Sequence, residues 1–142
     1  MTFPKEFEIR MRKILGDEYE SFAASYEKQP SRGLHVNLHK ISVRDFAECA
    51  DFPIGKIGFS PEAFTFDCEK IGNHPLHHAG AFYVQEPTAM IPLAMLDATD
   101  LRSRPELRVL DMCASPGGKS SQAANLFAGR GGFLLSNEYV PN

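Results

Sequence analysis

The sequence of 142 residues lacks any uninterrupted apolar run approaching the roughly 20 residues that a membrane-spanning helix requires. We therefore expect no membrane-spanning segment. Residues 1–13 mix charged and apolar side chains, so they do not resemble a secretion signal. The three cysteines, Cys49, Cys68 and Cys113, have no CxxC spacing, which argues against a disulfide framework and favours a reducing, cytoplasmic location.

An excess of positive charge is also lacking. Lys and Arg number 15 and Asp and Glu number 18, which gives a formal net charge of -3 at pH 7. Because a phosphate backbone is attracted to a basic surface, composition does not point to a nucleic acid as partner. The local group of Arg10, Arg12 and Lys13 is more typical of the solvated face of a short helix.

Residues 1–75 have the patterns of a small α+β domain. Turn-forming residues are densest at 72–75, and we place a domain boundary there. The expected elements, in chain order, are a helix over residues 3–15, a second helix capped by Asp17, a half-buried strand over 34–39, a helix capped by Ser42 that ends near Ala50, and short strands and turns over 52–67.

Residues 76–142 have a different pattern, in which short apolar runs alternate with helical spacing. A strand, a glycine-containing loop, a helix and a second strand follow one another, which predicts one βαβ unit with a parallel strand pair. The expected elements are an apolar run over 82–84, a helix that starts at Pro87, a buried strand over 108–112, a helix over 119–127 and a second buried strand over 133–138.

The chemistry is concentrated in the loop after the first strand of this βαβ unit. Ligands of open α/β sheets bind where the carboxyl ends of strands meet the amino end of a helix. Gly117 and Gly118 would let the backbone approach a ligand, and the free N–H groups of the helix start suit an anionic group. Glu138 ends the next strand, where a carboxylate can accept both hydroxyl hydrogens of a ribose.

Other readings of this loop stay open. A βα turn without any ligand would carry the same glycine pair. The dinucleotide fingerprint GxGxxG is absent, and a phosphate-binding GxxxxGK[ST] loop would need glycine where Cys113 stands. Pro116 also removes one backbone donor from such a loop. A small nucleotide-binding domain would have to prefer ATP to a compact charged nucleoside.

Three segments resemble the bacterial RNA cytosine-5 methyltransferases of the Sun/Fmu family, in particular the branch that is like ribosomal small-subunit methyltransferase F. The family's loop for S-adenosylmethionine, DxCAAPGGKT, is matched here except for Ser115 and Ser120, which are both small. The matching segments are LGDEY at 15–19 with SYE at 25–27, HHAGAFYVQEPTAM at 77–90, and DMCASPGGKS at 111–120.

The resemblance implies an α/β fold in which the small α+β amino-terminal domain, residues 1–75, is followed by the first part of a Rossmann-like S-adenosylmethionine-dependent methyltransferase domain, residues 76–142. It implies that Glu138 holds the ribose of the cofactor and that Asp111 orders the loop from below. The residues it implies for the methionine end of the cofactor are Cys113, Ala114, Ser115, Pro116, Gly117, Gly118 and Lys119.

The resemblance further implies ribosomal RNA as the partner of the small domain. Members of the family attack cytosine with a cysteine from a Pro-Cys or Thr-Cys segment, and neither dipeptide occurs here. We therefore assign no catalytic residue, interpret Cys113 as a small loop residue, and expect the chain to be a truncated, inactive part of a longer enzyme. The alternative is a noncatalytic RNA-binding or ribosome-assembly module that retains a vestigial cofactor loop.

Metal binding is not expected from the histidines near the domain boundary. His74, His77 and His78 lie near Cys68, but their spacing does not match the paired ligands of a structural zinc site. A linker with hydrogen-bonded or exposed histidines accounts for them. The sequence makes no prediction about the oligomeric state.

Overall fold

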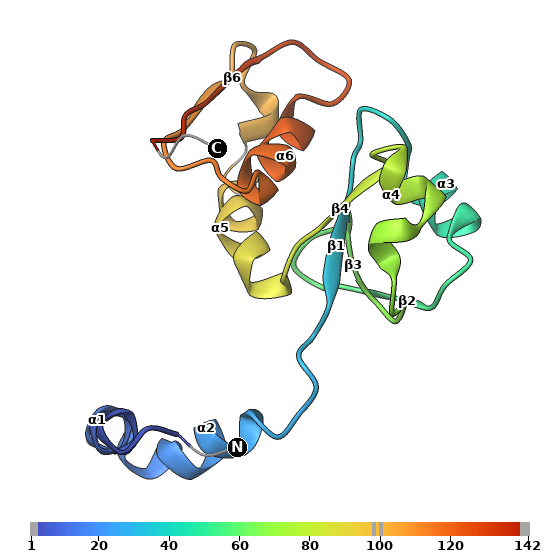
Figure 1. The fold of residues 1–142 in the computed structure, drawn as a ribbon. Coiled ribbons are helices and arrows are strands. Elements are labelled where there is room, and N and C mark those ends of the chain that lie inside the picture. Colours follow the sequence, from blue (N-terminus) through green and yellow to red (C-terminus); the bar gives the residue numbers. More distant parts are fainter. Residues whose placement is uncertain (1–2, 98, 100, 140–142) are drawn as a thin grey trace. The chain divides into compact units, whose positions relative to one another are not determined.

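The computed structural model describes residues 3–97, 99 and 101–139, without the side chain of Arg102. The chain divides into two compact units, Met1–Pro30 and Ser31–Asn142. Each unit is described by itself, and Figure 1 colours the chain from blue at the start to red at the end. No helix among the described residues is long and apolar enough to cross a membrane.

The first unit is a pair of helices, α1 (Lys5–Leu15) and α2 (Tyr19–Ser25), joined by one turn of 3₁₀ helix at Gly16–Glu18. Gly16 ends α1 with a positive φ of 52°, which a residue without Cβ adopts at low cost. Both helices confirm the sequence prediction. The predicted cap is wrong, because Asp17 lies inside the 3₁₀ turn and α2 has no hydrogen-bonding side-chain cap.

The second unit begins with a four-stranded antiparallel sheet in the order β2-β3-β1-β4. Its helices α3 (Val43–Cys49) and α4 (Pro75–His78) lie to one side of the sheet in Figure 1. Ser42 caps α3 as predicted, since its side chain accepts a hydrogen bond from the Asp45 N–H at 3.1 Å. The strands are β1 (Gly33–Val36), β2 (Ile54–Lys56), β3 (Ala63–Phe66) and β4 (Phe82–Val84).

The core of this sheet is aromatic. Phe46 from α3 is fully buried and contacts the rings of Phe64 and Phe82 at centroid distances of 5.8 and 5.7 Å. The strand β4 pairs with β1, so residues on both sides of position 75 belong to one sheet. The domain boundary at 75 stays a prediction. The buried members of the cluster are Leu34, Val36, Phe46, Phe64, Phe66, Ile71 and Phe82.

The rest of the second unit is the predicted βαβ segment. The strands β5 (Arg108–Asp111) and β6 (Phe133–Ser136) are parallel, with Asp111 opposite Ser136, and the helix α6 (Gly118–Ala124) connects them. A 3₁₀ turn, Asn125–Phe127, extends α6 to the predicted end. The helix α5 (Pro87–Asp97) starts at the predicted proline.

Two predictions about burial were wrong. In β5 and β6, Leu110, Phe133 and Leu135 are more than half exposed, because described residues pack on one face of the pair through Val109 and Leu134. Conversely, β1 is buried along its whole length rather than on one face. On the side opposite the aromatic core, His35 lies against Ser121 of α6, and Gly33 lies close to Gln85 and Pro87.

Candidate cofactor-binding site

The loop between β5 and α6 turns sharply through its glycines. Gly117 has a φ of 106°, which L side chains rarely adopt. A Cβ at Gly118 would lie 3.2 Å from Cδ of Gln85, so glycine also permits the close approach of the loop to β4. The positive φ of Gly117 and the tight contact at Gly118 account for glycine at these two positions, whereas their predicted role in letting the backbone approach a ligand stays a prediction.

The predicted role of Asp111 in ordering the loop agrees with its hydrogen bonds. One carboxylate oxygen accepts from the Ser120 hydroxyl at 2.7 Å, and the other accepts from the Cys113 N–H at 3.3 Å. The backbone of Asn137, directly after β6, accepts from the Ala114 N–H at 2.8 Å. The loop is therefore held at both strand ends before any ligand is considered.

Glu138 lies beside the glycine loop, two residues after the end of β6 rather than at the strand end that the sequence predicted. Its Oε2 accepts a hydrogen bond from the Ser115 N–H at 2.9 Å, and its Oε1 accepts from the Tyr139 N–H at 2.8 Å. The carboxylate thus points to the loop rather than away from it. Its role toward a ribose stays a prediction.

A cleft of about 240 Å³ lies beside this loop. One wall consists of loop residues that the sequence analysis had selected. The other wall runs from β4 into the first turn of α5, and none of its residues was among the predicted site residues. Of the predicted site residues, Gly117 and Glu138 do not line the cleft. The lining residues are Tyr83, Val84, Gln85, Glu86 and Ala89 on this second wall, and Cys113, Ala114, Ser115, Pro116, Gly118 and Lys119 on the loop.

Tyr83 connects the two walls. Its hydroxyl donates a hydrogen bond to the Pro116 carbonyl at 2.9 Å, and its ring stacks on His35 at a centroid distance of 5.7 Å. The polar pair after the apolar run, Gln85 and Glu86, was the available sequence signal, because polar side chains directly after the carboxyl end of a strand often face a site.

His35 is buried, although the half-buried strand predicted over 34–39 would leave alternate side chains exposed. Its side chain is 1% exposed, and its Nε2 lies 3.1 Å from the Ser121 hydroxyl oxygen of α6. Burial lowers the pKa of His35 from 6.5 to about 4, although an interaction with Gln85 acts in the opposite direction. The imidazole is therefore neutral at physiological pH, and it joins β1 to α6 without adding charge.

The cysteines are free thiols, and His74 near the predicted domain boundary is hydrogen-bonded within the fold. Cys113 is an exposed free thiol, and Cys49 and Cys68 are also free. His74 caps α4 through its Nδ1, which accepts from the Leu76 N–H, and its Nε2 lies 2.8 Å from Asp51. No group of three or more metal-ligating side chains occurs in the part of the chain that the structure describes.

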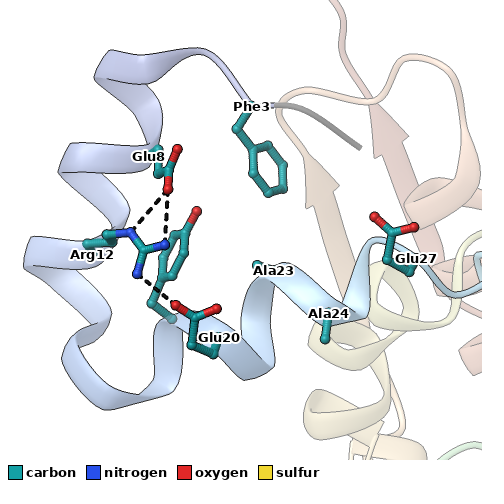
Figure 2. Close-up of a pocket in the computed structure, with 8 residues that line it drawn as sticks. Phe3, Glu8, Arg12, Glu20, Ala23, Ala24 and Glu27 are labelled. Atoms are coloured by element: carbon teal, nitrogen blue, oxygen red, sulfur yellow. Dashed lines mark hydrogen bonds and ion pairs between the residues drawn. The ribbon is translucent and has the colours of Figure 1, made fainter.

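A second cavity, of about 430 Å³, lies within the first unit. Figure 2 shows Arg12 at its centre, with ion pairs to Glu8 at 3.0 Å and Glu20 at 2.7 Å. These hydrogen bonds raise the pKa of Arg12, and its guanidinium also lies 3.9 Å from the centroid of the Tyr19 ring. The charge of Arg12 is therefore balanced locally, which agrees with the interpretation of this basic group as a solvated helix face.

Solved structures define the class of protein to which this fold belongs. A crystal structure of a methyltransferase homolog from Pyrococcus horikoshii is 28% identical, with a TM-score of 0.73 over 94% of this chain and 44% of that chain. A second crystal structure has a TM-score of 0.76 at 24% identity and supports the fold. The chain is thus a mixed α/β protein with an amino-terminal domain and the start of a methyltransferase fold.

The family follows from sequence comparison. The model for the N-terminal domain of 16S rRNA methyltransferase RsmF matches residues 3–87, and the chain belongs to this family. The ribosomal RNA small subunit methyltransferase F of Erwinia tasmaniensis is 36% identical over 96% of this chain, and that of Salmonella arizonae is 34% identical over the same share. The chain spans 30% of the length of these relatives.

Proposed function

We propose that this chain is the cofactor-binding amino-terminal part of an S-adenosylmethionine-dependent RNA cytosine-5 methyltransferase that acts on ribosomal RNA. The names of the relatives support ribosomal RNA as the substrate. The observation that supports this choice of cofactor is the approach of a carboxylate to the glycine loop. Glu138 Oε2 lies 2.9 Å from the Ser115 nitrogen. A loop for a compact charged nucleoside needs both parts.

The residues present fit such a cofactor. Gly118 lets the loop lie close to the opposite wall of the cleft, since a Cβ there would lie 3.2 Å from Cδ of Gln85. Lys119 lines the cleft and offers a positive charge to a carboxylate. Glu138 lies beside the loop, and the oxygens of an ionised carboxylate are hydrogen-bond acceptors of the kind that ribose hydroxyls need.

When bound, S-adenosylmethionine supplies the methyl group. The part of this chain is to hold the cofactor: the loop with Lys119 binds its amino-acid tail, and Glu138 binds its sugar. Cys113 has no role as nucleophile in this proposal, because the family takes that cysteine from a Pro-Cys or Thr-Cys segment that this sequence does not contain. We therefore expect cofactor binding without RNA methylation from this chain by itself.

Calorimetric titration of the chain with S-adenosylhomocysteine tests the proposal. We expect saturable binding that is lost in Glu138→Ala and kept in Glu106→Ala, a matched change of an exposed acid. Absence of binding would favour the noncatalytic RNA-binding module, and stronger competition by ATP would favour a nucleotide-binding domain. Methyl transfer to ribosomal RNA that is abolished by Cys113→Ala would overturn the assignment of that cysteine.

A further inference from the structure

We propose that Glu86 holds the ammonium group of the cofactor's amino-acid tail, opposite the loop that holds its carboxylate. This inference rests on the proposed function and deepens it. It adds a binding residue from β4 and α5 to a site that the sequence analysis built from the loop and Glu138.

Glu86 lies in the wall of the cleft that faces the glycine loop. It lies two residues after β4, on the wall of the 240 Å³ cleft that faces residues 113–119. Tyr83, on the same wall, is hydrogen-bonded to the Pro116 carbonyl at 2.9 Å. The distance between the walls is thus fixed by a direct bond, and a group in the cleft would contact both.

The hydrogen bonds of Glu86 leave room for a ligand. Its Oε2 accepts from the Thr88 hydroxyl and from the Ala89 N–H, which lies 3.2 Å away, at the start of α5. No such bond is described for Oε1. The bond from Thr88 lowers the pKa of the Glu86 carboxyl, so the group is ionised at neutral pH.

The charges of the cleft match those of the cofactor's amino-acid tail. The amino-acid tail of S-adenosylmethionine carries one ammonium and one carboxylate group. Among the described residues that line the cleft, Glu86 is the one acid and Lys119 is the one base. They lie on opposite walls, so the cleft presents one partner for each charge of the tail. An ammonium group needs an anionic or carbonyl acceptor, which the amide donors of the loop cannot supply.

The size of the cleft agrees with the tail rather than with the whole cofactor. Sites for drug-sized ligands usually measure about 300–1,000 Å³, and this cleft measures about 240 Å³. Ser115 lines the cleft, and its N–H donates to Glu138, which is proposed to bind the sugar. The tail would then extend from the loop toward β4 and the start of α5.

The test compares two ligands that differ in the tail. S-adenosylhomocysteine has the ammonium and carboxylate groups, whereas 5′-methylthioadenosine lacks both. We expect Glu86→Gln to weaken the binding of S-adenosylhomocysteine by about tenfold or more, because a charge-assisted hydrogen bond is lost. The affinity for 5′-methylthioadenosine should stay unchanged. Glutamine keeps an oxygen for the Ala89 N–H, so α5 retains its first hydrogen bond.

Binding is followed by chemical shifts in NMR titrations of the full chain, which also detect weak complexes. Glu106→Gln is the matched control, since it removes an equal charge at an exposed position that does not line the cleft. Equal weakening of both ligands by Glu86→Gln would overturn the inference, because Glu86 would then act through α5. Unchanged binding of both would also overturn it. If neither ligand binds the wild-type chain, the proposed function itself fails.

Discussion

The buried imidazole of His35 should make the stability of the second unit depend on pH. His35 lies between the aromatic sheet and α6, where it faces Tyr83, Gln85 and Ser121. None of these partners is charged at neutral pH. Protonation would therefore place a charge in a buried site without a counter-charge, which costs free energy.

The sign and size follow from the two pKa values. The pKa of His35 is lowered to about 4 in the folded chain from 6.5 in the unfolded chain. Between these values the unfolded state binds more protons, so stability is lost as the pH falls through 6.5 and the loss is complete below about 4. The free energy of unfolding should fall by about 2 kcal/mol from this group between pH 7 and pH 5.

Urea unfolding followed by circular dichroism at pH 7 and pH 5 measures this loss. His35→Gln should lose less stability than the wild type by about 2 kcal/mol, because glutamine does not titrate in this range. His78→Gln, at an exposed histidine, should behave as the wild type. An equal loss in wild type and His35→Gln would refute the reasoning. An NMR titration that gives His35 an ordinary pKa would refute it without any variant.

Two further predictions concern hydrogen bonds that join the antiparallel sheet to the loop and to the turn after α6. Tyr83→Phe should weaken the binding of S-adenosylhomocysteine several-fold in calorimetry and lower the free energy of unfolding by about 1 kcal/mol in thermal unfolding. The reason is that the Pro116 carbonyl loses its donor at 2.9 Å. Tyr139→Phe, at an exposed ring, should change neither quantity. Asn125→Ala should cost about 2–4 kcal/mol in urea unfolding, because its buried amide donates to the Val36 carbonyl at 2.8 Å and accepts from the Leu38 N–H at 3.0 Å.

Much of the order of elements could be predicted from local patterns. Ser42 was recognised as a cap because capping depends on residues a few positions apart. The parallel pair of β5 and β6 followed from the strand, loop, helix and strand sequence. Asp17 was assigned wrongly for the opposite reason, since a 3₁₀ turn there satisfies the backbone without its side chain.

Burial was harder to predict because it depends on which elements meet. The half-buried strand predicted over 34–39 would leave one face exposed, but Ser121 of α6 lies against His35, and Asn125 of the following 3₁₀ turn accepts a hydrogen bond from the Leu38 N–H. The apolar strands β5 and β6 were expected to be buried, yet the helices described here pack on one face of them. The apolar composition of a strand shows that it can be buried, whereas packing against elements distant in sequence decides which face is covered.

The candidate site divides in the same way. Its loop wall was predicted because glycines and a strand-end acid stand at recognisable positions. No residue of its second wall was predicted, because Tyr83 of β4 and Glu86, two residues after that strand, are remote from the loop in sequence. Contacts such as Tyr83 with Pro116 span 33 positions and leave no local pattern.

The joint between the antiparallel sheet and α6 explains why the two walls keep their spacing. Apolar surfaces in contact are non-directional, so they permit small shifts of one element along another. Here the joint is made by directional bonds. His35 lies beside Ser121, and His39 Nε2 lies 2.7 Å from the Ala124 carbonyl. The side chain of Asn125 bonds to Val36 of β1 and to Leu38, two residues after that strand. Because β4 pairs with β1 and α6 directly follows the loop, these bonds fix the wall of Glu86 against the glycine turn.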